Sequence, residues 1–198
     1  MLNIPEYKEY GGETKIALMD NSSLAFMHEL SQRSYPSDGI LSVYDLILIP
    51  KWVMEEIEDS TYRSTYVEQL QAQGYPIRWI DETKYGTFVN DEDVNLYYIV
   101  EAAVSRVSEL MRFLRREVKT EDLIDLPSAE EWMNRLYDEW PIHGRTLSTG
   151  RALKKNAGEI SLTILAEIFA WYHDGVDSLT IYTQDTDCLL YTSPSPRD

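Results

Sequence analysis

Four short apolar segments constrain the fold of this chain more than any other feature of its sequence. Each is rich in β-branched or aromatic residues and is bounded by Gly, Pro, Asp or Asn, which is typical of buried β-strands. The segments are Lys15–Met19, Tyr44–Ile49, Tyr75–Ile80 and Ser178–Thr183. Helical patterns lie between them, and parallel strands need such crossover connections. The sequence therefore predicts an α/β fold with a parallel sheet flanked by helices on both faces.

The connections between these strands are predicted to be helical. Apolar spacing indicates one helix over Ser22–Gln32 and a second over Lys51–Gln73, which begins after a proline and ends before a glycine. The third connection is much longer, and we expect it to be entirely helical over Asp81–Asn156, with a long helical insertion at about residues 90–145.

Two helices are expected inside the insertion. The first covers about Glu92–Val118 and places apolar residues at alternating spacings of four and three: Leu96, Val100, Ala103, Val107, Leu110 and Leu114. The second opens at Ser128 with a capping box and buries Trp132, Leu136 and Trp140. At about 1.5 Å per residue the first helix would be about 40 Å long. It either packs on its own domain or forms a hairpin that binds a second copy or another partner.

The composition excludes several classes of protein. The 198 residues suit a single domain with a core of its own, and one cysteine excludes a disulfide framework and favours a reducing, cytoplasmic location. No apolar run is long enough for a membrane span or a secretory signal. The net charge of −16 repels phosphate, so nucleic acid would need a cation to mediate its binding.

The last residues of the chain differ from the rest. From Cys188 to Asp198 the composition shifts to Ser and Pro, and the string is similar, codon for codon, to the translation of a transposase sequencing adapter. We therefore expect one natural domain over residues 1–187, truncated at its C-terminal end, followed by a non-native tail over residues 188–198.

Acidic residues follow two of the predicted strands. Asp20 comes directly after the first strand, and Asp185 and Asp187 come after the fourth. Glu56 and Glu159 lie near the beginnings of two predicted helices. In an open parallel sheet, loops and helix N-termini converge at the carboxyl ends of the strands, so we expect these acids to face one pocket.

A cluster of carboxylates points to a metal ion, because like charges raise one another's pKa unless a cation compensates them. Ligation by oxygen alone suits Mg²⁺ or Mn²⁺, and such ions can clamp a phosphodiester and generate hydroxide from bound water. Structural roles stay open for each acid. Asp20 or Ser22 can cap the next helix, and Glu56 can lie on a solvated helix face. Glu159 can interact favourably with the positive end of a helix dipole.

Taken together, these motifs resemble the PIN domain. The matching positions are Asp20 before Asn-Ser-Ser, Glu56 after Ile-Pro, Glu159 after Ala-Gly and Asp185 after Thr-Gln. The resemblance covers about Lys15–Ile80 and Asn156–Asp187. It implies a Rossmann-like sheet and an endoribonuclease that depends on Mg²⁺ or Mn²⁺, often the toxin of a toxin–antitoxin pair.

The resemblance also implies roles for individual residues. Carried over position by position, it makes Asp20, Glu56, Glu159 and Asp185 catalytic metal ligands and Asp187 an accessory ligand. RNA is the implied substrate. The implied protein partner is an antitoxin, or a second copy bound through the helical insertion, which is longer than in the compact toxins of this family.

One basic stretch interrupts this acidic chain. Gly144–Asn156 contains no acid and four cations: Arg145, Arg151, Lys154 and Lys155. Because it directly precedes Glu159, we interpret it as a track for the RNA backbone, with phosphate contacts that position the substrate without reading its sequence. A solvated loop is the alternative. The predicted substrate-binding residues are Ser22, Arg151, Lys154 and Lys155.

Two other functions stay open on the sequence alone. Asp20 and Ser22 resemble the start of the Asp-x-Ser-x-Ser loop of metal-dependent adhesion modules, although Leu24 stands where the last serine belongs. The chain could also be an inactive PIN-like scaffold that uses its helical segment for protein contacts.

Overall fold

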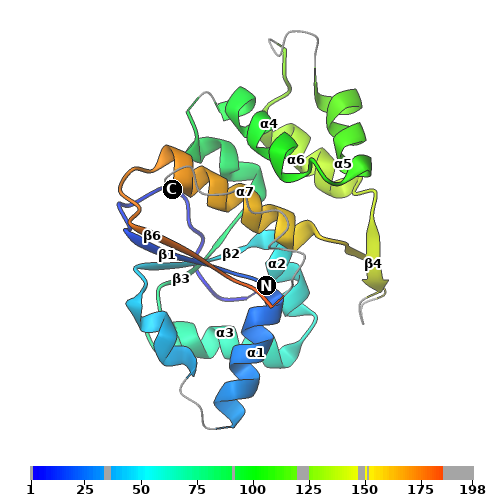
Figure 1. Cartoon of the computed structure of the whole chain (residues 1–198). Coiled ribbons are helices and arrows are strands. Elements are labelled where there is room, and N and C mark those ends of the chain that lie inside the picture. Colours follow the sequence, from blue (N-terminus) through cyan, green and yellow to red (C-terminus); the bar gives the residue numbers. More distant parts are fainter. Residues whose placement is uncertain are drawn as a thin grey trace.

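A four-stranded parallel sheet lies at the centre of the molecule (Figure 1). Its strands, in the spatial order β3-β2-β1-β6, are β1 (Lys15–Met19), β2 (Leu46–Pro50), β3 (Ile77–Ile80) and β6 (Ser178–Tyr182). The register places Ile16 beside Leu46 on one side and beside Leu179 on the other. The structure is a computed structural model and describes residues 2–33, 37–90, 92–119, 125–146, 150 and 152–184.

The predicted α/β class and parallel sheet are confirmed. All four expected strands form, and each observed end lies within two residues of the predicted one. The sheet separates two cores because side chains alternate along each strand. In β1, Ile16 and Leu18 belong to one core, and Ala17 and Met19 belong to the other.

Helices cover the two faces of the sheet. One face carries α1 (Asn21–Gln32), α3 (Thr61–Ala72) and the short 3-10 segment η1 (Ser37–Val43), which are drawn below the sheet in Figure 1. The other face carries α7 (Ala157–Tyr172), which crosses above the sheet. Helix α2 (Lys51–Glu58) contacts both α1 and α7. It therefore lies where the two layers meet.

The single helix predicted over Lys51–Gln73 is wrong. The chain forms α2 and α3 instead, with a break at Asp59 and Ser60. The Ser60 side chain caps α3 by accepting the backbone N–H of Arg63, at 3.5 Å. Ser60 begins a new helix, but the apolar spacing continues across it. Periodicity alone therefore gives no sign of the break.

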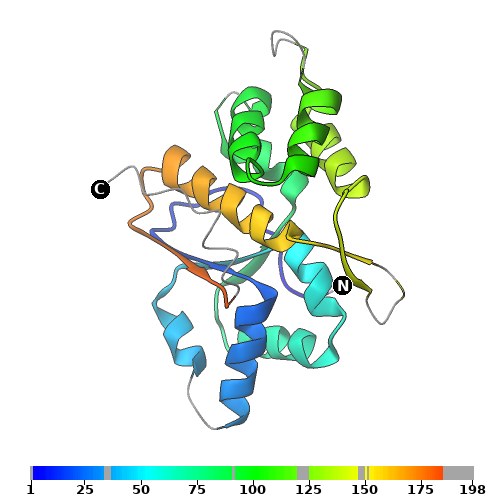
Figure 2. The same cartoon turned by 45° about the vertical axis from the view of Figure 1, so that its right-hand side comes forward.

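A second layer of helices lies on the far side of α7 from the sheet (Figure 2). This helical layer comprises η2 (Glu82–Phe88), α4 (Glu92–Ala103), α5 (Ser108–Phe113), the π-type turn η3 (Leu114–Val118) and α6 (Ala129–Asp138). The single helix predicted over Glu92–Val118 is wrong, because the chain turns between α4 and α5. Val104 and Val107 in that turn are buried, so the apolar pattern runs through the break unchanged.

The apolar stripe predicted in the helical layer is buried in the chain's own core. All six of its residues belong to the same core as the upper face of the sheet: Leu96, Val100, Ala103, Val107, Leu110 and Leu114. Helix α6 begins as predicted, since the Ser128 side chain accepts the backbone N–H of Glu131 at 3.2 Å. Trp132, Leu136 and Trp140 are buried. Binding of a partner through this layer stays a prediction.

The expectation of an entirely helical segment over Asp81–Asn156 is also wrong. A small antiparallel pair, β4 (His143–Thr146) and β5 (Ala152–Lys154), extends from the helical layer beside the beginning of α7 (Figure 1). These strands have only three or four residues and lack an alternating apolar pattern, so no strand signal marks them in the sequence.

The longest helix, α7, separates the sheet from the helical layer and has buried side chains on almost every face. Its 16 residues are fewer than the about 20 that a membrane-spanning helix requires. Within the described ranges, no helix is both long and apolar enough to cross a bilayer.

Candidate functional site

The carboxyl end of β1 carries Asp20, which is only 7% exposed. Asp20 caps α1, because its Oδ1 accepts the backbone N–H of Ser23 at 2.6 Å. Its Oδ2 accepts the hydroxyls of Ser22, at 2.7 Å, and of Thr183. The structural alternative for Asp20, that it caps the next helix, is therefore confirmed. Two carboxylate oxygens offer about four lone-pair positions, so the three hydrogen bonds leave room for another ligand.

The end of β6 is attached to the same point. The backbone N–H of Asp20 donates to the Tyr182 carbonyl at 3.1 Å, and the N–H of Gln184 donates to Ser22 Oγ at 3.0 Å. The carboxyl ends of β1 and β6 thus meet, as the sequence predicts. Asp185 and Asp187 follow β6 directly but lie outside the described residues.

Glu56 is linked to this point through Asn21. The Asn21 side-chain amide donates to Glu56 Oε2 at 3.2 Å. This hydrogen bond joins the first residue of α1 to the second turn of α2, beside the Asp20 cap. Glu56 is half-buried, so the expectation of a fully solvated helix face does not describe it.

The beginning of α7 lies against Glu56. A Cβ placed on Gly158 would lie 3.9 Å from Glu56 Oε1 and only 3.1 Å from Val53 Cγ2. The absent side chain is what lets α7 approach α2 this closely. Glu159 is the next residue and is half-buried in the first turn of α7. Asn156, the residue directly before α7, adopts a left-handed conformation (φ 61°), which asparagine tolerates better than most residues.

These contacts bring three of the predicted acids to one edge of the sheet. Asp20 caps α1, Glu56 lies on α2, and Glu159 lies on α7. A hydrogen bond from Asn21 joins α1 to α2, and Gly158 lets α7 lie close to α2. The part of the chain that the structure describes contains no group of three His, Cys, Asp or Glu residues close enough together to hold a metal ion. The acids therefore share an edge without forming a complete ligand shell among the described residues.

Asn21 is a site residue that the sequence analysis did not select. Its Oδ1 atom is buried and, among the described residues, has no hydrogen-bond partner. A buried polar atom without a partner is costly, and one that sits between two carboxylate-bearing segments suggests a missing ligand. The signal was present in the Asp-Asn-Ser-Ser string, where an amide follows the strand-end aspartate.

Glu82 is a second residue that the sequence analysis missed. It is an acid that follows β3 and is fully buried. Its Oε1 accepts the backbone N–H of Trp52 at 3.0 Å and the Ser161 hydroxyl at 2.8 Å. Because Pro50 provides no side-chain cap, Glu82 fulfils that role for α2. Its Oε2 has no partner among the described residues, and burial raises the pKa of Glu82 to about 8.

The carboxylate of Asp81, the neighbour of Glu82, forms an ion pair with a lysine side chain. Lys51 Nζ lies 2.6 Å from Asp81 Oδ2, and the Thr83 N–H and hydroxyl donate to Oδ1. Partial burial alone would raise the pKa of Asp81, but the hydrogen bonds from Lys51 and Thr83 outweigh it and lower the pKa. Asp81 is therefore a paired, ionised carboxylate next to a buried one.

The predicted cationic residues have mixed placements. Lys154 lies with its Nζ 3.7 Å from the centre of the Tyr137 ring and also donates to the Tyr137 carbonyl. Lys155 is exposed. Arg151 and the Arg145 side chain lie outside the described part. The Lys154 ammonium is thus engaged within the protein rather than extended toward an edge of the sheet.

Tyr137 connects this basic strand to α2. Its hydroxyl donates to Glu55, and its ring stacks on Trp52 with centroids 4.9 Å apart. Burial raises the pKa of Tyr137, and the nearby negative charges of Glu82 and Glu56 raise it further. The β4–β5 pair is therefore held near the same end of α2 that carries Glu56.

Comparison with known proteins adds no assignment to this geometry. No protein-family model, no curated protein and no solved structure matched the chain.

Proposed function

We propose that this chain is a PIN-like endoribonuclease that uses Mg²⁺ or Mn²⁺ to hydrolyse RNA phosphodiesters. One observation carries the proposal. The Asn21 amide lies between Asp20 and Glu56, bonded to Glu56 through its nitrogen and left with a buried, unpartnered oxygen in the described part of the chain. An oxygen-only set of two carboxylates and one amide is the donor chemistry that Mg²⁺ and Mn²⁺ prefer.

The oxygen donors at this edge are of the type that such an ion prefers, and the described acids need Asp185 or Asp187 to complete a ligand set. Asp20, Glu56 and Glu159 would hold it, with Asp185 added from the end of β6 and Asp187 as an accessory ligand. When bound, the ion would activate a water molecule and neutralise charge on the phosphodiester.

The chain's own residues hold the acids in place. The Ser23 N–H and the Ser22 and Thr183 hydroxyls orient the two Asp20 oxygens. Asn21 orients Glu56 in the same way. Carboxylates that are already positioned lose little conformational freedom when they bind a ligand, which favours tight and specific coordination.

The test is an RNA cleavage assay with and without Mn²⁺, using the wild type, Asp20→Asn and Glu159→Gln. Asp174→Asn is the matched control, because Asp174 is exposed and precedes β6 at the opposite end of that strand. We expect cleavage only with metal, a loss of at least about a hundredfold in both site variants, and wild-type activity in the control. Cleavage that survives both site substitutions, or that never occurs with Mn²⁺ present, contradicts the proposal.

Metal binding gives a second readout that does not depend on substrate. An ion that binds only the folded chain raises its melting temperature, and the rise grows with the ion concentration. We expect Mn²⁺ to raise the melting temperature of the wild type and of Asp174→Asn, and to have a smaller effect on Asp20→Asn. Equal rises in all three proteins would show that the ion does not bind at this edge.

A further inference from the structure

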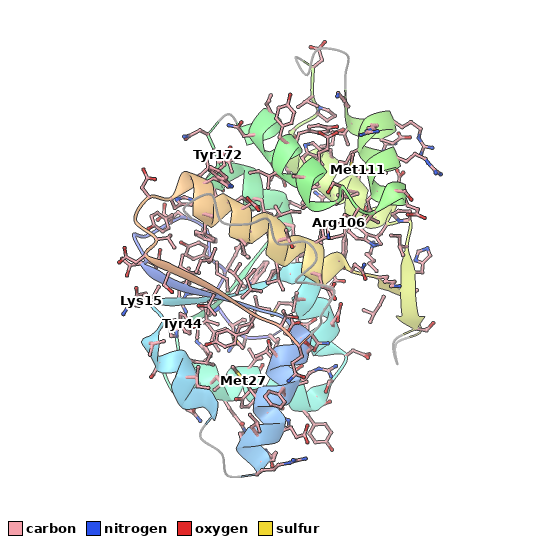
Figure 3. The ribbon with its side chains drawn as sticks, in the orientation of Figure 1. Lys15, Met27, Tyr44, Arg106, Met111 and Tyr172 are labelled. Atoms are coloured by element: carbon pink, nitrogen blue, oxygen red, sulfur yellow. The ribbon has the colours of Figure 1, made fainter. Side chains whose placement is uncertain are left out.

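The helical layer contains an arginine-lined groove. Its volume is about 590 Å³, within the range of about 300–1,000 Å³ that is common for ligand sites. The lining residues are Ser105, Arg106, Ser108, Met111, Arg112, Arg115 and Arg116. Figure 3 labels Arg106 and Met111, which lie in the helical layer on the side of the molecule where α7 begins. Among the described residues, no acid lines the groove.

The arginines gather there because this segment is amphipathic. Residues 108, 112 and 115 are spaced four and three apart, so they share one face of the segment formed by α5 and η3. The opposite face points into the core through Leu110, Leu114 and Val118. The turn between α4 and α5 adds Arg106 beside that face. Burial of the apolar side therefore presents the cationic side outward.

Two of the arginines have weak or local partners. Arg115 Nε lies 4.0 Å from Glu101, at the limit of an ion pair, and Arg116 pairs with its neighbour Glu117. Such exposed pairs contribute little and are easily exchanged for a stronger anion.

The other two arginines, Arg106 and Arg112, also line the groove, and Arg112 interacts electrostatically with Glu109 on the same helix. Arg106 and Arg112 are exposed, and neither forms an ion pair with any residue that the structure describes. The chain has only 18 Lys and Arg against 34 Asp and Glu, and four of those cations line this one groove. A local cationic patch on a strongly acidic protein attracts an anion that the rest of the surface repels.

We propose that this groove binds the phosphate backbone of single-stranded RNA. A planar guanidinium donates two parallel hydrogen bonds to a phosphate group, and Arg106 and Arg112 are available to do so. Met111 adds an apolar side chain that can contact a sugar or a base. The choice of RNA rests on the proposed function. The groove would then hold substrate remote from the carboxylate edge, with contacts that position RNA without reading its sequence.

The test measures binding of a fluorescent single-stranded RNA of about 12 nucleotides to the full chain, in chelator and without divalent metal. The variant is Arg106→Ala/Arg112→Ala. The control, Lys8→Ala/Lys15→Ala, removes the same charge from two exposed lysines. Figure 3 labels Lys15 at the end of β1 that is far from Arg106. Both double variants alter exposed side chains, so equal melting temperatures confirm that folding is intact.

We expect the groove variant to bind roughly tenfold more weakly at about 100 mM salt and the control to bind like the wild type. The slope of log K against log salt should fall by about 1.4 in the groove variant, because each lost phosphate contact contributes about 0.7 for a single strand. Wild-type affinity and slope in the groove variant would overturn the proposal. The proposal would also be overturned if an oligoglutamate of equal charge bound as tightly as RNA, because that result would favour an acidic protein partner.

The outcome separates this proposal from the proposed function. Binding is measured without metal and therefore without cleavage. If RNA binding depends on Arg106 and Arg112 but no cleavage occurs with Mn²⁺, the groove stands and the nuclease fails. If cleavage depends on Asp20 while the groove variant binds RNA normally, the nuclease stands and the groove fails.

Discussion

Asp20 follows β1 directly and Glu82 lies two residues after the end of β3, and each accepts a backbone N–H at the N-terminus of a helix, yet their surroundings differ. Asp20 accepts three hydrogen bonds, from Ser23, Ser22 and Thr183, and is 7% exposed. Glu82 accepts two and is fully buried, with Oε2 unpartnered among the described residues. The comparison shows that the position of an acid at a strand end does not decide its chemistry. The number of donors and the access of solvent decide it.

The difference follows from what covers each strand end. The end of β1 lies beside β6, and Ser22, Ser23 and Thr183 donate to Asp20 there. Glu82 lies beneath α2 and α7, against Trp52, Ser161 and Tyr85. Three predictions test this contrast, in order of decreasing effect.

The largest effect is expected from the pH dependence of Glu82. Its pKa is raised from an ordinary 4.5 to about 8, so the folded state holds a proton that the unfolded state has lost. The contribution of Glu82 to stability is complete below about pH 4.5, declines as the pH rises through that window, and is lost above about pH 8. At about 1.4 kcal/mol per pKa unit, the total change is on the order of 5 kcal/mol.

Glu82→Gln should remove this pH dependence. Glutamine keeps the acceptor for Trp52 and cannot ionise, so the difference in unfolding free energy between variant and wild type should grow in favour of the variant from about pH 5 to about pH 8. Denaturant titrations at several pH values measure it. A difference that does not change with pH would show that Glu82 titrates normally.

A smaller loss is expected for Asp20→Ala, about 3 kcal/mol at neutral pH. The substitution removes a helix cap, which typically contributes about 1 kcal/mol, and two hydroxyl hydrogen bonds, which contribute about 1 kcal/mol each. Thermal and denaturant unfolding without metal measure the loss. Asp20→Ser is the control that retains a capping oxygen, and it should recover about 1 kcal/mol. No loss in the alanine variant would contradict the observed hydrogen bonds.

The smallest of the three effects is expected for Ser161→Ala, about 2 kcal/mol. The Ser161 hydroxyl donates to Glu82 and bonds the Tyr85 hydroxyl at 2.7 Å, so its removal leaves a buried Tyr85 hydroxyl unpaired. The hydrogen bond from Ser161 also lowers the pKa of Glu82, so the variant should shift the pH transition of stability upward. Thr163→Val on the same helix is the control, because Thr163 bonds only within α7. An unchanged transition would show that Ser161 does not hold the Glu82 carboxylate.

The sequence predicted the strands well because their signal is local. Each strand is a short apolar run with polar or turn residues at its ends, and that pattern reflects burial on both faces of a parallel sheet. The Asp20 position was predictable for the same reason, since it is the first polar residue after such a run.

The breaks in the helices could not be predicted from periodicity. Val104 and Val107 are buried although both lie in the turn between α4 and α5, so the apolar spacing gives no sign of the turn. Glu82 and Asn21 were missed for a different reason. Their importance depends on what packs over them, which is determined by Trp52, Ser161 and Glu56 from distant parts of the chain.

The pairing of β1 with β6 has a consequence for the order in which this edge is completed during synthesis. Thr183, which donates to Asp20, is 163 residues further along the chain. At about 5–20 residues per second, a ribosome needs roughly 10–30 s to reach Thr183 after Asp20 has been added. The strands β2 and β3 are made in that interval, whereas the donor that follows β6 is made later. A nascent chain therefore carries Asp20 with its local serine partners alone until Thr183 has been made, and the contacts that join the ends of β1 and β6 form only after that.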